Sequence, residues 1–180
     1  MDKFVIVFID DILVYYKNKD DNTKHLRLVL RGLEAKKLYA KFKKCEIWLD
    51  KVIFLGHLVS KDEIAVHLTK IDTVLNWPQP KNVIEIISFL GLAGYYRRFV
   101  KGFAKIANPL MALTRKEHKY SWIEPCERSF QELKKWQTTV PILTIPQGST
   151  RFVIYCDASK FELGVVLMQN GKAIAYVSQQ

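Results

Sequence analysis

The sequence predicts an α+β fold, in which short hydrophobic strands are combined with amphipathic helices. Two observations carry this prediction. Apolar runs of four to eight residues, rich in β-branched and aromatic side chains, occur near both ends of the chain, whereas the middle shows hydrophobic residues at helical spacing. The 180 residues are 49% hydrophobic, so the chain can bury a core and is expected to be globular.

The first predicted element is a β-hairpin over residues 4–15, F-V-I-V-F-I-D-D-I-L-V-Y, whose two-residue turn is expected to carry Asp10 and Asp11. Two unit charges about 4 Å apart repel by about 4 kcal/mol where the effective dielectric constant is near 20, and a bound cation would offset that repulsion. Paired carboxylates suit two-metal phosphoryl transfer. Asp is also a common turn residue, so the hairpin alone leaves both interpretations open.

Residues 17–60 are predicted to form a polar connection, a helix and short strands. The amphipathic helix is expected over about 23–37, because Leu and Val recur on one face: Leu26, Val29, Leu30, Leu33 and Leu38. Strands are expected at about 38–42, 46–49 and 52–60. Gly56 lies inside the last of these, where a bulge or close backbone approach is expected.

Two capping patterns predict the helices that follow. Thr69 with Asp72 resembles a capping box that opens a short helix ending at Trp77-Pro78, and Asn82 with Glu85 repeats the pattern before a longer helix. The longer helix is expected to bury a stripe of residues at helical spacing: Ile86, Phe89, Leu92, Ala93, Tyr96, Phe99 and Val100.

Gly91 and Gly94 lie off that stripe, and each costs about 1 kcal/mol relative to Ala in a helix interior. Close approach of another backbone is the usual reason for such glycines. That backbone could be nucleic acid or a second protein helix, and the residues leave both possibilities open.

The last third of the chain is expected to begin with a helix near Pro125 that runs to about 138. Residues 141–150 read as a linker with a short extended piece. Beyond it, R-F-V-I-Y-C and L-G-V-V-L-M are predicted strands, and Asn170-Gly171 predicts a hairpin turn. Asp157 closes the first of these strands, a position where Asp is commonly a turn former.

Charge points to a polyanionic partner. Lys and Arg total 28 against 18 Asp and Glu, a net charge of +10, although charge alone does not separate nucleic acid from an anionic membrane. No apolar run reaches the length that spans a bilayer, and we expect an intracellular protein, in a cytoplasmic particle or the nucleus, with no membrane partner. The three Cys and four His are scattered and indicate neither a disulfide framework nor a zinc site.

Ordered motifs along the chain resemble the Pol polyprotein of gypsy-type long-terminal-repeat retrotransposons. F-I-D-D resembles the polymerase motif of reverse transcriptases, usually written Y/F-x-D-D. The others are, in order, H-L-R-L-V-L (25–30), K-L-Y-A-K-F-K-K-C-E (37–46), F-L-G-H-L-V-S (54–60), V-L-N-W-P-Q-P (74–80), S-F-L-G-L-A-G-Y-Y-R-R-F-V (88–100), F-Q-E-L-K (130–134) and Y-C-D-A-S (155–159).

The resemblance implies a partial reverse-transcriptase palm with a primer-grip hairpin at 1–66, thumb and connection at 67–140, a linker at 141–150, and the first strands of a ribonuclease H-like sheet at 151–180. The implied activity is RNA-directed DNA polymerisation with ribonuclease H. Its partners would be an RNA–DNA or DNA template–primer duplex, a dNTP and the remainder of the Pol polyprotein.

The resemblance also implies site residues. Asp10 and Asp11 would bind Mg²⁺ as part of a two-ion polymerase site, with Asp10 the better candidate for direct ligation, and Asp157 would be the first ribonuclease H carboxylate. The implied nucleic-acid-binding residues come from the primer grip and the thumb helix around 88–101: Phe54, Leu55, Gly56, His57, Gly91, Gly94, Tyr95, Arg97, Arg98 and Lys101.

Three positions depart from the usual family pattern. E-I-A-V-H-L (63–68) lacks a Gly and a Pro, Ile87 stands where Arg is common, and Glu162 stands where Gly is common. The further acidic ligands of both sites would lie outside these 180 residues, so we expect the isolated chain to be inactive as an enzyme. The alternative interpretation is a non-catalytic nucleic-acid-binding remnant of a decayed or domesticated element.

Overall fold

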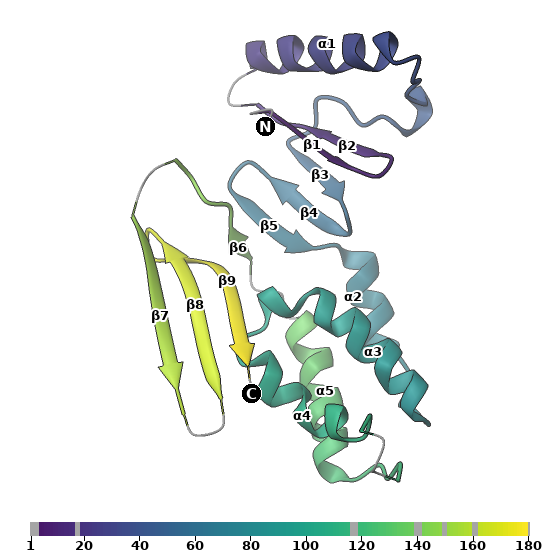
Figure 1. Cartoon of the computed structure of the whole chain (residues 1–180), viewed down its shortest axis with the longest axis vertical. Helices are drawn as coiled ribbons and strands as arrows, with labels where there is room; N and C mark the ends of the chain where they lie inside the picture. The colour runs from purple at the N-terminus through teal and green to yellow at the C-terminus, as the bar shows by residue number, and fades with distance from the viewer. Residues whose placement is uncertain are drawn as a thin grey trace. The chain divides into compact units, whose positions relative to one another are not determined.

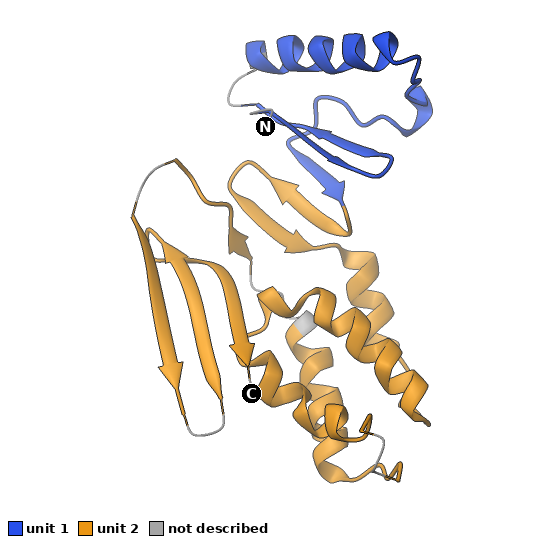
Figure 2. Ribbon diagram, viewed as in Figure 1, with its two compact units in different colours: residues 1–54 blue, residues 55–180 orange. Residues whose placement is uncertain are grey.

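The computed structural model describes residues 4–16, 19–115, 119–138, 142–148, 151–159 and 162–179. These fall into two compact units, residues 1–54 and residues 55–180 (Figure 2). Helices and sheets occur together along the chain, which confirms the predicted α+β class (Figure 1).

The first unit contains a hairpin, a helix and a short strand. Strands β1 (Val5–Phe8) and β2 (Asp11–Val14) pair antiparallel, and helix α1 (Lys19–Ala35) confirms the amphipathic helix predicted nearby. The 3₁₀ turn η1 (Phe42–Lys44) and strand β3 (Lys51–Phe54) complete the unit.

The strands predicted at 38–42 and 46–49 are wrong. Residues 42–44 form the 3₁₀ turn, and the other residues of both segments lie outside regular strands. Lys37 and Trp48 have φ of +55° and +66°, values that interrupt an extended backbone. Apolar composition alone misled the prediction, because a strand also needs a neighbouring strand to bond its backbone groups.

The second unit begins with a small antiparallel sheet of strands β4 (His57–Ser60), β5 (Glu63–Val66) and β6 (Leu143–Thr144), in that order. The single strand predicted over 52–60 is wrong, because a turn at Leu55 and Gly56 divides it. The short extended piece predicted within 141–150 is confirmed as β6, whose Leu143 is fully buried.

Helices α2 (Leu68–Leu75), α3 (Val83–Tyr95), α4 (Phe103–Ala112) and α5 (Glu124–Thr138) follow, with a 3₁₀ turn η2 (Arg97–Phe99) after α3. The helix predicted near Pro125 is thus confirmed as α5. The thumb helix does not continue to about 101 as predicted: α3 ends at Tyr95.

The capping pattern at Asn82 is confirmed and the one at Thr69 is wrong. The Glu85 backbone N–H donates to Asn82 Oδ1 at 3.0 Å, and the Glu85 carboxylate accepts from the backbone N–H of Lys81 at 2.8 Å. Helix α2 instead begins after His67, and the His67 ring bonds the Thr69 hydroxyl at 2.8 Å. Thr69 therefore lies inside the first turn of α2, where its hydroxyl bonds the His67 ring and does not cap the helix.

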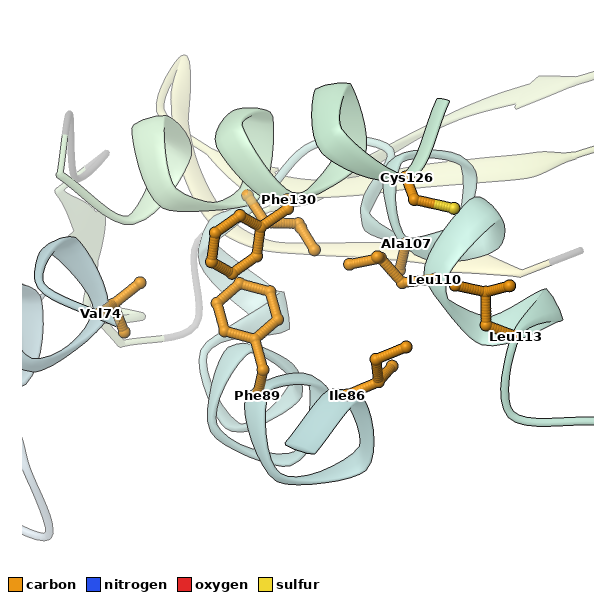
Figure 3. Packing of buried hydrophobic residues seen from close by; sticks show 9 residues of the cluster. Val74, Ile86, Phe89, Ala107, Leu110, Leu113, Cys126 and Phe130 are labelled. Atoms are coloured by element: carbon orange, nitrogen blue, oxygen red, sulfur yellow. The ribbon is translucent and has the colours of Figure 1, made fainter. Parts of the chain in front are cut away.

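The main core of the second unit joins helices α2 to α5, as Figure 3 shows for the buried side chains. Phe89 of α3 and Phe130 of α5 meet with ring centroids 4.7 Å apart, and both side chains are almost fully buried. Full burial of one such side chain stabilises the fold by about 1.5–3 kcal/mol. The predicted stripe of α3 is confirmed, since Ile86, Phe89 and Ala93 are all buried.

A three-stranded antiparallel sheet closes the second unit, with strands β7 (Phe152–Ala158), β8 (Leu163–Gln169) and β9 (Lys172–Gln179) (Figure 1). Asn170 and Gly171, with φ of +52° and +74°, form the predicted hairpin turn. Strand β9 also contributes Tyr176 to a second core formed by five buried residues: Val66, Ile71, Tyr96, Phe99 and Leu143. In the described part of the chain, no helix is long and apolar enough to cross a membrane.

Candidate nucleic-acid interface and carboxylate sites

The acidic hairpin turn differs by one residue from the prediction. The turn residues are Ile9 and Asp10, whereas Asp11 is the first residue of β2 and lies opposite Phe8. Ile9 has φ +52° and is 85% exposed. A β-branched residue in the left-handed region stores about 1–3 kcal/mol of strain. The backbone therefore presents Asp10 and Asp11 from a strained turn.

Asp10 and Asp11 are both exposed, and their oxygens are the ligand type that Mg²⁺ prefers. Their donor chemistry therefore fits a magnesium ion. Among the described residues, no group of three or more His, Cys, Asp or Glu side chains is placed to hold a metal. The structure thus brings two of the predicted ligands together and adds no third.

The turn that follows β3 is held by two tyrosines of the α3 end. Leu55 and Gly56 have φ of +50° and +74°. The Tyr95 hydroxyl donates to the Leu55 carbonyl at 2.7 Å, and the Tyr96 hydroxyl donates to the Gly56 carbonyl at 3.3 Å. A Cβ at position 56 would lie 2.8 Å from the Tyr96 hydroxyl, so only glycine fits there. The close backbone approach predicted for Gly56 is confirmed, although in a turn and not a bulge.

His57 is buried against the same aromatic side chains. Its ring centroid lies 5.4 Å from that of Tyr96 and 5.7 Å from that of Phe99, and its Nδ1 bonds the Leu55 carbonyl at 3.0 Å. Burial lowers the pKa of His57 below its usual 6.5; the Leu55 carbonyl opposes this change and the Arg98 charge adds to it. The neutral imidazole is therefore the form that suits the fold.

The predicted basic residues lie just beyond α3. Arg97 and Arg98 are exposed on η2, and Lys101 is exposed in the turn before α4. Arg97 and Arg98 directly follow Tyr95 and Tyr96, whose hydroxyls bond the Leu55–Gly56 turn, and they precede Phe99, whose ring lies 5.7 Å from that of His57. We call the surface formed by the Leu55–Gly56 turn and the exposed side chains of Tyr95, Arg97, Arg98 and Lys101 the candidate interface. Phe54, also predicted to bind nucleic acid, is the last residue of β3 in the first unit.

The two helix glycines differ in their surroundings. A Cβ added to Gly91 would meet no described atom within 4 Å, whereas one on Gly94 would lie 4.0 Å from the Phe103 ring. Gly91 is exposed, so packing against a helix in the described part of the chain does not account for it. Gly94 has an ordinary contact with α4. The contact with Phe103 favours packing against a protein helix as the reason for Gly94. For Gly91, the structure leaves both nucleic acid and a separate protein helix as the approaching backbone.

Asp157 lies in β7 opposite Gly164 of β8, beside a cavity of about 240 Å³. The cavity is also lined by Lys101, Gly102 and Glu162. Among the residues that the structure describes, none bonds one buried carboxylate oxygen of Glu162. The sequence pattern marks Glu162 only as a departure from the family and does not indicate that it lines this cavity. In the same way it marks Tyr96 only as a core residue, because the partner of its hydroxyl lies 40 residues away.

The D-D hairpin, the glycine turn held by the end of α3 and the β7–β9 sheet follow one another along the chain in the order that the resemblance to reverse transcriptases implies. Family models agree: residues 1–59 match the reverse transcriptase (RNA-dependent DNA polymerase) family, and residues 122–180 match the RNase H-like domain found in reverse transcriptase.

The related proteins show in which kind of polyprotein these two domains occur together. The chain is 34% identical over 184 residues to the retrovirus-related Pol polyprotein from transposon 297 of Drosophila melanogaster, covering 99% of this chain and 17% of that protein. It is 31% identical over 165 residues to the transposon Tf2-3 polyprotein of Schizosaccharomyces pombe, covering 92% and 12%. The chain belongs to the reverse transcriptase and ribonuclease H-like region of transposon Pol polyproteins, and it spans less than a fifth of the length of these relatives.

A shorter relative is an uncharacterized mitochondrial protein, AtMg00860 of Arabidopsis thaliana, which is 39% identical over 131 residues, covering 72% of this chain and 82% of that protein. Among solved structures, a foamy viral protease-reverse transcriptase in complex with double-stranded DNA has a TM-score of 0.86 at 24% identity over 97% of this chain and 32% of its own. A complex of that viral protein with an RNA/DNA hybrid has a TM-score of 0.83 at 24% identity, over 97% and 24%. At this identity the likeness shows the fold.

Proposed function

We propose that this chain forms part of an RNA-directed DNA polymerase with ribonuclease H and that it binds a template–primer duplex at the candidate interface. Residues 1–66 would be the C-terminal palm with the primer grip, 67–140 the thumb and connection, 141–150 a linker, and 151–180 the first ribonuclease H strands. The observation that carries the proposal is the pair of tyrosine hydrogen bonds to the Leu55–Gly56 turn, which fix a backbone turn beside exposed arginines.

The candidate interface has the chemistry that a duplex backbone requires. Arg97, Arg98 and Lys101 are exposed, and a phosphate neutralised by Arg or Lys releases condensed counterions. Tyr95 is 51% exposed while its hydroxyl stays on the Leu55 carbonyl, so its ring face can contact a sugar or base. The open space beside Gly91 on α3 would let a nucleic-acid backbone approach the helix closely. The foamy viral relatives by fold are solved with double-stranded DNA and with an RNA/DNA hybrid, which supports this partner.

Asp10 and Asp11 would hold Mg²⁺ at the polymerase site, with Asp10 as the direct ligand, and Asp157 would hold Mg²⁺ at the ribonuclease H site. When bound, the ions would stabilise the attacking and leaving oxygens of nucleotidyl transfer with a dNTP and of RNA hydrolysis. The contribution of this chain is to present the carboxylates: the Ile9–Asp10 turn does so at the first site and the end of β7 at the second.

The test is binding of the 180-residue chain to a fluorescein-labelled RNA–DNA hybrid, measured by anisotropy over a salt series. Log affinity should fall linearly with log salt, by about 0.9 for each phosphate neutralised on B-DNA. Arg97→Ala should lower the slope by about one unit on every sequence alike. Gly91→Leu should weaken binding, because the larger side chain excludes the nucleic-acid backbone while the net charge is unchanged. Leu has a better helix propensity than Gly, so loss of the helix would not explain weaker binding.

The matched control is Arg128→Ala, which removes the same charge from an exposed position of α5 where Arg128 pairs with Glu124 at 3.7 Å. Arg128→Ala should leave the salt slope nearly unchanged. Binding that is unaffected by both Arg97→Ala and Gly91→Leu would remove α3 and η2 from the nucleic-acid surface. If Arg97→Ala and Arg128→Ala lose the same affinity, binding depends on the total positive charge of the chain and not on a contact at Arg97.

The second candidate function is a non-catalytic nucleic-acid-binding protein. The observation that favours it is the 39% identity to the plant mitochondrial protein, of which the matched region covers 82%. Flanking genomic DNA discriminates between the two functions. An in-frame upstream palm with a further Asp supports the polymerase, whereas a separate promoter and stop codon support the independent binding protein.

A further inference from the structure

The β7–β9 sheet carries Asp157 on a row of residues that crosses all three strands. Asp157 pairs with Gly164 of β8, and Gly164 pairs with Ser178 of β9. Residues directly opposite each other in antiparallel strands project from the same face of the sheet. The position of Ser178 is therefore tied to that of Asp157 through two strand pairings.

Ser178 caps helix α4 of the second unit, which also carries the candidate interface. Helix α4 begins after Gly102, whose φ of +67° and missing side chain leave the first turn without a cap of its own. The Ala104 backbone N–H donates to the Ser178 hydroxyl at 2.9 Å, across 74 residues of sequence. A hydroxyl that accepts from a first-turn N–H is the normal capping interaction, but here it comes from a strand. Arg97, Arg98 and Lys101 of the candidate interface lie within six residues of the start of this helix.

Gln169 makes a second attachment at the opposite end of the sheet. Its side-chain oxygen accepts from the Gln147 backbone N–H at 2.9 Å, and its side-chain nitrogen donates to the Gln147 carbonyl at 3.1 Å. Gln169 is only 2% exposed, so the strength of this two-point bond is little reduced by solvent. The Gln147 side chain in turn donates to Asp62 in the β4–β5 turn.

Between these attachments, Tyr176 of β9 packs on the core that contains Tyr96 and Phe99. Tyr96 is the residue whose hydroxyl holds Gly56. The sheet is thus joined to the rest of the second unit by a cap on α4, an amide pair at Gln147 and an apolar core that includes Tyr96 and Phe99. In Figure 1, β9 is the strand of this sheet that lies beside β6 and α4.

We propose that Ser178 and Gln169 are positioning residues, which fix Asp157 relative to the Arg97–Lys101 segment. Lys101 and Asp157 both line the cavity of about 240 Å³. In so far as the inference concerns a duplex, it rests on the proposed function: a hybrid bound at the candidate interface would meet Asp157 at one fixed position along its length.

The positional test needs no nucleic acid. Spin labels are placed on native Cys156, which is exposed and projects from the face opposite Asp157, and on Ile84→Cys, where Ile84 is 76% exposed on α3. Cys45→Ser removes the other exposed thiol, and Cys126 is buried. Pulsed electron–electron resonance then gives the distribution of distances between the β7–β9 sheet and α3.

One narrow distance is expected in the parent chain. Loss of one capping bond should raise the population of displaced sheets about five- to tenfold in Ser178→Ala, whereas Ser178→Thr, which keeps the hydroxyl, should retain the parent distribution. Gln169→Leu should broaden it independently. The control is Thr114→Ala, which removes a 2.7 Å hydroxyl bond at the other end of α4 and should change nothing.

The functional consequence is read with an iron chelate on Cys156, which cuts a bound hybrid near Asp157 without any ribonuclease activity. The parent should cut a recessed hybrid within a narrow window from the primer end, and Ser178→Ala should spread the cuts. Parent-like distances in both Ser178→Ala and Gln169→Leu, or in Ser178→Ala alone if Gln169→Leu does not fold, would overturn the inference. If no hybrid binds, the proposed function fails while the spin-label distances still decide the positioning roles.

Discussion

Gly56→Ala should be among the most damaging small substitutions in the second unit. The new Cβ would lie 2.8 Å from the Tyr96 hydroxyl, closer than any ordinary contact. Tyr96 is 1% exposed and packed in the core with Phe99, so its ring has little room to move away. The expected result is a strained turn and loss of the Tyr96–Gly56 hydrogen bond.

The magnitude follows from two separable costs. An L-residue at φ +74° loses about 1–2 kcal/mol relative to glycine. Displacement of the Tyr96 hydroxyl from its buried bond adds about 1–3 kcal/mol. Gly171 provides the matched control, because it has the same φ of +74° but no described atom lies within 4 Å of its added Cβ. Gly171→Ala should therefore show the first cost alone.

Urea unfolding followed by tryptophan fluorescence measures both variants at pH 7. Tyr96→Phe removes the hydroxyl that meets the new Cβ, so Gly56→Ala with Tyr96→Phe should cost about 1–2 kcal/mol less than the sum of the single substitutions. The reasoning is refuted if Gly56→Ala costs no more than Gly171→Ala, or if the two substitutions at positions 56 and 96 are simply additive.

Three further predictions concern single residues. Because the folded pKa of His57 lies below the 6.5 of the unfolded chain, the unfolded state binds the proton more readily, so stability should be full above pH 6.5 and should fall as the pH drops through the folded pKa. His57→Gln should flatten the dependence of the urea midpoint on pH between 7.5 and 5. Ile9→Gly should stabilise the first unit by up to about 1 kcal/mol, because relief of the left-handed strain exceeds the backbone entropy cost of glycine; thermal melting measures this. Asn82→Ala should cost about 1 kcal/mol by removing the bond from the Glu85 N–H, again read from urea unfolding.

Each of these has a clear contrary result. An unchanged pH dependence in His57→Gln would assign the titration to another group. A lower melting temperature in Ile9→Gly would show that the exposed Ile9 side chain has a stabilising contact. For Asn82, the conservative variant Asn82→Asp should retain most of the stability, and equal losses in Asn82→Asp and Asn82→Ala would argue against capping.

The sequence by itself determined the elements whose signals are local. The stripe of α3, the Asn82–Glu85 cap and the Asn170–Gly171 turn depend on residues within a few positions of one another, and the structure has all three. Periodicity could not locate the Leu55–Gly56 turn inside an apolar run, nor show that Lys37 and Trp48 interrupt the strands expected around them. Hydrophobic periodicity also predicted that the thumb helix continues past Tyr95, because Phe99 and Val100 are buried at helical spacing although they lie in and after a 3₁₀ turn.

Only the tertiary structure decided which distant groups meet. The bonds from Tyr95 and Tyr96 to the Leu55–Gly56 turn span 40 residues, and the bond from Ala104 to Ser178 spans 74. No local pattern marks such partners, since a tyrosine hydroxyl or a strand serine reads identically whether it faces solvent or a distant carbonyl. Their meeting follows from packing of the shared core of Tyr96, Phe99, Leu143 and Tyr176, where burial of apolar surface brings the elements together and leaves each polar group to find a partner.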